Sequence, residues 1–160
     1  MAVIKTLKDG RYRILTTPYQ GREHIFGNVI SIGCVYPKNE CPLCIDISLP
    51  SSKPYWLLYA IDRSDNTSYV YKLDYGLFRQ IQSFAKDYDW GNPTGYDIEI
   101  KPSPTRFLVF AKQKIPLSAH DKLIADNIDK DYFVQYTKPW LVERIEKTYK
   151  EFQDKLAILL

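Results

Sequence analysis

One of the two histidines and all three cysteines of this chain have the types and the spacing of a metal site. The four residues are His24, Cys34, Cys41 and Cys44, and their order along the chain is H-x9-C-x6-C-x2-C. Three thiolates and one imidazole complete the tetrahedral coordination that Zn²⁺ prefers in proteins. Because protein groups take all four positions, we expect one structural zinc ion per chain and no open position for a catalytic water.

Two other interpretations of the cysteines stay open. They could be reduced, buried thiols that bind no metal. A Cys-Pro-x-Cys motif also occurs in glutaredoxin-like redox sites, where it follows a strand and begins a helix whose N-terminus lowers the thiol pKa. Here the motif is followed by residues 45–50, which alternate in hydrophobicity like a short strand and end at a proline. This pattern favours a metal site over redox chemistry, and the odd number of cysteines disfavours a disulfide framework.

Length and composition indicate a globular protein with one core. The chain has 160 residues, of which 45% are hydrophobic, and these values are ordinary for a single domain with a small appendage. No apolar run approaches the roughly 20 residues that cross a bilayer, and the first residues lack the apolar stretch of a secretory signal. We therefore expect a cytosolic protein in a reducing compartment, with no membrane partner.

Positive charge is concentrated in the N-terminal part of the chain. The formal net charge is +3, and residues 1–60 hold seven Lys and Arg against four Asp and Glu. The basic residues that lie closest together are Lys5, Lys8, Arg11, Arg13 and Arg22. A run of charges is usually a solvated face, so it indicates a nucleic-acid surface only when aromatic residues accompany it.

Aromatic residues are dense in the middle of the chain, where residues 55–96 hold eleven of them. Residues 55–61 and 69–73 alternate like two strands joined by a polar turn at 63–68, which predicts a hairpin. Tyrosines form strands well and also fill cores, but the cluster together with basic residues favours a surface on which nucleobases stack. The predicted nucleic-acid contacts are Arg11, Tyr12, Arg13, Arg22, Tyr55, Trp56, Tyr59, Tyr69, Tyr71, Lys72 and Tyr75.

The remaining patterns predict a mainly β fold. The further segments that alternate like strands are 11–15, 96–100 and 106–110, and the last two predict a second hairpin across Pro102-Ser103-Pro104. Residues 76–85 have helical spacing. Five or six short strands with one helix between them are expected of a small β-barrel such as an OB-fold. We expect this core over residues 1–118, with the zinc-binding loop inserted at about 20–50 between the early strands.

Residues 119–160 are expected to form a helical extension of the core. Within residues 140–160, apolar side chains recur at alternating spacings of three and four, with charged side chains between them. This pattern predicts an amphipathic helix that either packs on its own domain or binds a partner or a second copy. The second histidine, His120, lies beside Asp121 and is interpreted as a residue at a helix start rather than a general base.

Several short motifs match one protein family when they are taken together. They are His24 to Cys34, Cys41-Pro42-Leu43-Cys44, Tyr55-Trp56 through Ile61-Asp62, Tyr71 to Gly76, Pro93-Thr94-Gly95-Tyr96-Asp97-Ile98 and Pro116-Leu117-Ser118. With these motifs the chain resembles the zinc-containing, helix-destabilising single-stranded DNA-binding proteins of T-even-type and related tailed bacteriophages. The match extends over roughly residues 10–118, and its motifs are specific as a set rather than singly.

This resemblance implies an OB-fold with an inserted zinc site, and single-stranded DNA as the ligand. It also implies a role in phage replication, recombination or repair, in the cytoplasm of an infected bacterial cell. The match has departures, since the loop between Cys34 and Cys41 is short and Leu73 stands where the family has a DNA-contacting tyrosine. Residues 140–160 also differ from the family's acidic C-terminal tail, which recruits replication partners. We therefore expect this chain to share the family's DNA binding, but not its regulation by a C-terminal tail.

The expected function is binding rather than catalysis. Lys and Arg would neutralise phosphates, and Tyr and Trp rings would stack on bases without reading the sequence, with RNA as a further ligand. The chain has no paired-carboxylate signature, no phosphate-cradling glycine loop and no nucleophile with a credible base. A zinc-stabilised module that binds replication or transcription proteins stays an alternative, as does a redox enzyme that uses Cys41 and Cys44.

Overall fold

The computed structural model describes residues 4–26, 30–34, 41–45, 51–129, 131, 133, 150, 151 and 154. The chain divides into two compact units. The first consists of Met1–Tyr19 and Trp56–Asp129, and the second of Gln20–Tyr55 and Lys130–Leu160. Of the helix predicted at 140–160, residues 150, 151 and 154 are described and are helical. The rest of that prediction lies outside the described residues.

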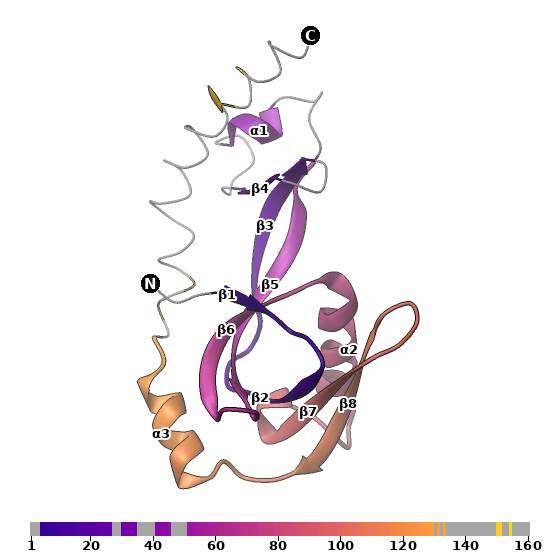
Figure 1. The fold of residues 1–160 in the computed structure, drawn as a ribbon, viewed down its shortest axis with the longest axis vertical. Helices are drawn as coiled ribbons and strands as arrows, with labels where there is room; N and C mark the ends of the chain where they lie inside the picture. The colour runs from indigo at the N-terminus through magenta and orange to yellow at the C-terminus, as the bar shows by residue number, and fades with distance from the viewer. Residues whose placement is uncertain are drawn as a thin grey trace. The chain divides into compact units, whose positions relative to one another are not determined.

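A mixed β-sheet forms the body of the first unit (Figure 1). Its strands are β1 (Ile4–Thr6), β2 (Gly10–Ile14), β5 (Lys53–Asp62, whose first residues belong to the second unit), β6 (Thr67–Leu73), β7 (Tyr96–Pro102) and β8 (Phe107–Lys114). Their order is β1-β6-β5-β2-β7-β8, with β1 parallel to β6 and the other neighbours antiparallel. The mainly β prediction is confirmed, and the two predicted hairpins are β5–β6 and β7–β8.

Two α-helices and a short 3₁₀ turn accompany this sheet in the part of the first unit that the structure describes. They are α2 (Tyr75–Lys86), η2 (Pro93–Gly95) and α3 (Ala119–Asn127). Helix α2 begins after Asp74, whose Oδ1 accepts a hydrogen bond from the Leu77 amide at 2.8 Å. This N-cap pairs a donor that the helix itself leaves unpaired. The helix buries Leu77 and Ile81, as the helical spacing of the sequence predicts.

The Gln80 side chain joins α2 to the edge of β8. Its amide nitrogen donates to the Phe107 carbonyl oxygen at 2.9 Å, and its amide oxygen accepts from the Val109 backbone N–H at 2.9 Å. The side chain thus pairs with the strand as a neighbouring strand would, which covers part of an otherwise open edge. This contact holds the start of α2 next to the β7–β8 loop.

The core of the first unit lies between the sheet and α2. Alternate residues of β5, namely Trp56, Leu58 and Ala60, belong to it. Its other buried members are Leu7, Tyr12, Ile14, Tyr71, Leu73, Leu77, Ile81, Tyr96, Ile98, Ile100 and Val109. The opposite face of β5 is covered as well, because Leu57 and Ile61 have no exposed surface. β5 is therefore a central strand buried on both faces, which corrects the open hairpin surface expected from its tyrosines.

A cluster of charged side chains ties α3 to the sheet. The guanidinium of Arg63 contacts both carboxylate oxygens of Asp97 on β7 and both of Asp121 on α3, at 2.9–3.1 Å. Arg11 and Arg13 also contact Asp97, at 3.0 and 3.6 Å. The side chains of Asp97 and Asp121 are only 10% and 7% exposed, so water screens these ion pairs less than it screens pairs on the surface.

Replacing Asp121 with asparagine should lower the free energy of unfolding by about 1.5–3 kcal/mol at neutral pH, because Arg63 loses its charge-assisted hydrogen bonds to α3 and keeps those to Asp97. Hydrogen bonds from Arg63 are the main cause that lowers the pKa of Asp121. The stabilisation is therefore present above the ordinary carboxyl pKa and is lost as the pH falls through the lowered pKa of the folded state. Urea titrations from neutral pH down to about pH 2 should show the difference shrinking towards zero.

The matched control for this change is Asp126→Asn, at an exposed position of the same helix. It should leave the urea midpoint unchanged at every pH. Equal effects of the two changes would show that α3 is not held by the Arg63 cluster.

The second unit is built on an antiparallel hairpin of β3 (Tyr19–Phe26) and β4 (Ile30–Gly33), followed by the short helix α1 (Pro42–Ile45). β3 also pairs with β5. In chain order this unit is inserted between β2 and β5. None of the helices in the described part of the chain combines the length and the apolar character that crossing a membrane requires.

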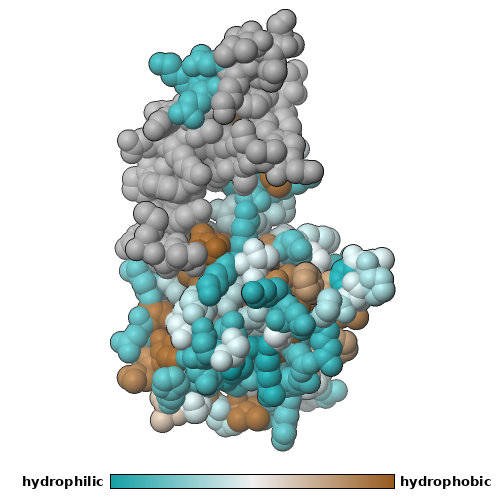
Figure 2. Space-filling view, in the orientation of Figure 1, coloured by the Kyte–Doolittle hydropathy of each residue, from teal (hydrophilic) through white to brown (hydrophobic). Residues whose placement is uncertain are grey.

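Figure 2 shows hydrophilic side chains over most of the visible face of the first unit, with a few separate hydrophobic spots. Apolar side chains scattered singly are normal for a protein surface.

Candidate metal centre and nucleic-acid interface

The β3–β4 hairpin brings His24 and Cys34 to one face. In the antiparallel register His24 lies opposite Ile32. The amide of Cys34 continues the ladder beyond β4 by donating to the Arg22 carbonyl oxygen at 2.7 Å. Side chains two residues apart on a strand share a face, and directly opposite side chains do as well. The hairpin therefore sets an imidazole and a thiol side by side.

A single helical turn supplies the other two thiols. The amides of Cys44 and Ile45 donate to the Cys41 carbonyl oxygen at 3.0 and 3.3 Å, which forms the turn of α1. The prediction of a strand directly after the motif is wrong at residue 45, because these two hydrogen bonds make that residue helical. The rest of the predicted strand, residues 46–50, lies outside the described residues. A turn of four residues carries little of the dipole that activates a thiol at the start of a long helix.

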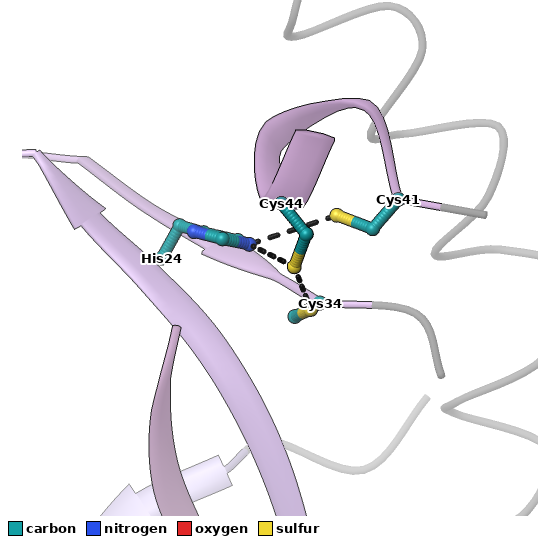
Figure 3. A group of neighbouring side chains, drawn as sticks. All are labelled: His24, Cys34, Cys41 and Cys44. Atoms are coloured by element: carbon teal, nitrogen blue, oxygen red, sulfur yellow. Dashed lines mark hydrogen bonds between the residues drawn. The ribbon is translucent and has the colours of Figure 1, made fainter. Parts of the chain in front are cut away.

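The four candidate ligand atoms converge (Figure 3). Nε2 of His24 lies 3.6 Å from Cys41 Sγ and 3.4 Å from Cys44 Sγ, and the Sγ atoms of Cys34 and Cys44 are 3.3 Å apart. All four atoms lie within 4.8 Å of one another. Atoms bound to one zinc ion at the usual Zn–S and Zn–N distances are separated by about 3.5–3.8 Å in a tetrahedron. The cluster therefore has the chemistry and the size to hold a metal ion such as zinc.

Burial strengthens the case for a cation at this cluster. His24 and Cys41 have no exposed surface, and Cys34 is buried. Burial is the largest cause that raises the pKa of the Cys34 thiol, followed by its contact with Cys44 and the charge of Cys41. A divalent cation has the opposite effect, because a coordinated thiol is deprotonated. Without a metal the buried thiols stay protonated and neutral, so the convergence of four donor atoms is what favours metal binding over three unliganded thiols.

Comparison with known proteins identifies no family for this chain. No protein-family model matches the sequence, and no curated protein matches it.

Five of the predicted aromatic contacts are buried in the protein. Tyr12, Tyr55, Trp56, Tyr59 and Tyr71 are between 1% and 7% exposed. Tyr12 and Tyr71 pack edge to face in the core, with ring centroids 5.3 Å apart. A ring enclosed by neighbouring side chains offers no face to a base, so none of these five rings is proposed as a base contact. Their burial stabilises the fold instead.

Two of the predicted arginine contacts take part in the charged cluster on the sheet. Arg13 is 3% exposed, and it donates from Nε to the Thr94 carbonyl oxygen at 3.0 Å and from Nη2 to the Ile115 carbonyl oxygen at 2.7 Å. These hydrogen bonds pair the Arg13 guanidinium with backbone carbonyl oxygens inside the protein, so Arg13 is not proposed as a phosphate contact. Arg11 contacts Asp97, but its side chain is 48% exposed, and it stays a candidate contact.

Tyr69, Lys72 and Tyr75 keep exposed surface. Tyr69 and Lys72 are half-buried. The ring of Tyr69 lies 3.5 Å from Lys5 Nζ, and its hydroxyl donates to Asp65 Oδ2 at 2.6 Å. Tyr75 is 61% exposed, which makes it the most open aromatic ring of the predicted set.

Tyr75 packs against Trp56, which is itself stacked on Phe78. The rings of Trp56 and Phe78 lie face to face, with centroids 4.0 Å apart and an angle of 2° between their planes. The Tyr75 ring lies 6.1 Å from the Trp56 ring and is tilted by 38° to it. Trp56, which the sequence predicted as a base contact, thus holds the exposed tyrosine in place from within the core.

A groove that the sequence did not predict lies between the start of α2 and the β7–β8 loop. It has a volume of about 460 Å³, and its lining includes Gly76 and Leu77 on one side and Arg106 and Phe107 on the other. Phe107 is 37% exposed, so the groove combines an aromatic ring with a cation. In the sequence this loop has only turn-forming residues to mark it, and no spacing rule brings it next to α2.

Proposed function

We propose that this protein binds single-stranded DNA without sequence preference, and that a zinc ion stabilises its second unit. The observation that carries the proposal is the exposed Tyr75 ring packed on Trp56 at the start of α2, together with a groove at the same end of the helix that contains Arg106 and Phe107. Every base has a π face, so stacking on a tyrosine tolerates any sequence. Stacking on such a platform is worth about 1–3 kcal/mol per base.

Two exposed arginines, one on α2 and one in the β7–β8 loop, are candidate phosphate contacts. Arg79 follows Tyr75 by one helical turn and is exposed, so the two side chains are neighbours on the helix surface. Arg106 is the cation of the groove, and it comes from the facing loop. Asp74 lines the groove as well, but its carboxylate is engaged in capping α2. The path we propose for the phosphates runs along Arg79 and Arg106.

The order of the strands supports an OB-fold for the first unit. The run β6-β5-β2-β7-β8 with α2 between β6 and β7 fits a five-stranded Greek-key barrel with one intervening helix. In OB-folds the loops between the first two and the last two strands help to bind oligonucleotides. Here those connections are the inserted second unit and the β7–β8 loop, and the latter lines the groove.

We assign Zn²⁺ to the cluster of His24, Cys34, Cys41 and Cys44, with one ion per chain. A closed set of four protein ligands supplies folding free energy rather than a reactive centre. The ion would join the β3–β4 hairpin to α1, which otherwise is a single helical turn. In a phage-infected bacterial cell, a protein of this kind would coat and protect single strands during replication, recombination or repair, and RNA is a second ligand to test.

A zinc-stabilised module that binds replication or transcription proteins is the second candidate. Two exposed isoleucines near the metal ligands favour it, since Ile25 follows His24 and Ile45 follows Cys44, at 37% and 64% exposure. Such a module predicts no measurable affinity for single-stranded DNA.

Thermal melting of a duplex distinguishes the two candidates. A protein that binds single strands lowers the melting temperature of an alternating dA-dT duplex at low salt, because it stabilises the separated strands. We expect a decrease that grows with protein concentration. An unchanged or raised melting temperature would favour the protein-binding module.

Replacing Arg106 with alanine should weaken binding to single strands of every base composition equally, because phosphate contacts carry no sequence information. The slope of log affinity against log salt should become shallower by about 0.7. Fluorescence titrations at several salt concentrations measure both quantities. Lys122→Ala removes one charge from an exposed position of α3 and serves as the control, with no change expected. Equal slopes for the parent and Arg106→Ala proteins would exclude a phosphate at this side chain.

A further inference from the structure

We infer that Arg22 is a positioning residue of the metal centre, which fastens the metal-binding segment at its base. This inference rests on the proposed metal site and is independent of DNA binding. It replaces the phosphate-binding role that the basic cluster of the sequence suggests for Arg22.

Arg22 connects three parts of the second unit. Its carbonyl oxygen accepts the hydrogen bond from the Cys34 amide, at 2.7 Å. Its Nε donates to the Ser52 Oγ at 2.8 Å, and its Nη2 donates to the Ser52 carbonyl oxygen at 2.6 Å. Ser52 is 7% exposed and directly precedes β5. One residue therefore holds a ligand on one side and the exit of the metal-binding segment on the other.

We call the hydrogen bonds between Arg22 and Ser52 the clasp, and the four proposed metal ligands all lie between its two ends in the sequence. His24, Cys34, Cys41 and Cys44 fall inside the segment that begins at Arg22 and ends at Ser52. A contact between those ends closes the segment and removes conformational freedom that metal binding would otherwise have to remove. The clasp and the metal thus constrain the same chain segment. By linkage, each should strengthen the other.

The residues next to the clasp enforce the same closure. A Cβ atom at Gly21 would lie 2.5 Å from Cζ of the Tyr55 ring, so only glycine lets β3 approach this buried ring. Tyr55 is 5% exposed, and its ring lies over the backbone of β3. Gly21 with Tyr55 and Arg22 with Ser52 are therefore two adjacent contacts that join β3 to the start of β5.

The guanidinium fork explains why this position is an arginine. Two nitrogen atoms of one planar group reach the hydroxyl and the carbonyl of the same serine, and the rest of the side chain loses little further freedom. A lysine keeps the charge but has no such fork. Arg22→Lys should therefore behave like Arg22→Ala for metal binding, whereas a phosphate contact would tolerate lysine.

The test is a competition for Zn²⁺ between the full-length zinc-loaded protein and a chromophoric chelator. Arg22→Ala and Arg22→Lys should each weaken Zn²⁺ binding by about 10–100-fold, which is typical when a group that orients metal ligands is lost. Ser52→Ala keeps the carbonyl acceptor and should give a smaller loss. Lys86→Ala, at an exposed position of α2, is the charge-matched control and should leave Zn²⁺ affinity unchanged.

A Co²⁺-substituted protein gives a second readout that a purely structural role would not change. The visible absorption of Co²⁺ bound to thiolates reports the geometry of the ligands, so Arg22→Ala should alter the spectrum even when Co²⁺ is saturating. Unchanged Zn²⁺ affinity together with an unchanged Co²⁺ spectrum would overturn the inference, whatever the thermal stability of the variant. A parent protein that binds no Zn²⁺ would instead contradict the metal site itself.

Discussion

Replacing Cys41 with serine should remove the metal and leave residues 20–55 without stable structure. This is the largest effect we expect, because structural zinc supplies roughly 10–16 kcal/mol in zinc-finger peptides at neutral pH, and a neutral hydroxyl is a poor substitute for a buried thiolate ligand. Cys41 has no exposed surface and lies 3.6 Å from His24 Nε2. Elemental analysis should give one zinc per chain in the parent protein and none in the variant.

The matching control is the parent protein treated with a strong zinc chelator, which should reproduce the behaviour of Cys41→Ser. Limited proteolysis should cut both proteins within the second unit, while the fragments of the first unit stay intact because its core is separate. A parent protein prepared without chelators that contains no zinc, yet resists proteases throughout residues 20–55, would contradict the metal assignment.

Replacing Trp56 with alanine should lower the stability of the fold, whereas replacing Tyr75 with alanine should lower the affinity for DNA, although both are aromatic residues of one cluster. Trp56 is 5% exposed and stacks on Phe78, so Trp56→Ala should lower the free energy of unfolding by about 3–5 kcal/mol. Tyr75 is 61% exposed, so Tyr75→Ala should leave the fold intact. It should weaken binding to oligo(dT) by about 1–3 kcal/mol, which is a factor of about 5–150.

Thermal unfolding and fluorescence titration of the same samples separate the two effects. Tyr88 is fully exposed and is not part of the Tyr75 cluster, so Tyr88→Ala is the control and should change neither quantity. If Tyr75→Ala binds oligo(dT) as tightly as the parent protein does, Tyr75 is not a stacking platform. A loss of affinity with Tyr88→Ala of the same size would show that the titration reports a nonspecific change.

The cluster of His24 with the three cysteines could be predicted from the sequence because the residue types and their spacing are those of a metal site. A close pair of cysteines needs one turn of the chain, and that turn forms between Cys41 and Ile45. The hairpin that brings His24 and Cys34 to one face depends on register, which the sequence left open. The hairpins β5–β6 and β7–β8 could be predicted as well, because alternating hydrophobicity and polar turns are local signals.

The buried state of the aromatic residues could not be predicted in the same way. Tyrosine has an apolar ring and a polar tip, so it suits both a core and a wet surface. On β5 the alternation does not reveal that both faces are covered, since that depends on segments distant in the sequence. Arg13 illustrates the same difficulty, because its burial requires backbone acceptors at Thr94 and Ile115 that no local pattern places nearby.

The groove at the start of α2 arises entirely from tertiary contacts. The Gln80 side chain bonds to the backbone of β8, and this contact brings the β7–β8 loop to the start of α2. A helical pattern identifies Gln80 only as a polar residue on a helix. Spacing rules therefore do not describe the contact that forms the groove at the start of the helix on which Tyr75 lies.

Titration of the zinc-verified protein with oligo(dT) at two salt concentrations tests the central claim most directly. Quenching of the intrinsic tryptophan and tyrosine fluorescence should saturate as bases stack on the protein. Log affinity should fall with log salt at a slope of about −1 to −3, as expected for a few neutralised phosphates, and mixed-sequence strands should bind like oligo(dT). No saturable binding at the lower salt, or an affinity that does not change between the two concentrations, would contradict the account.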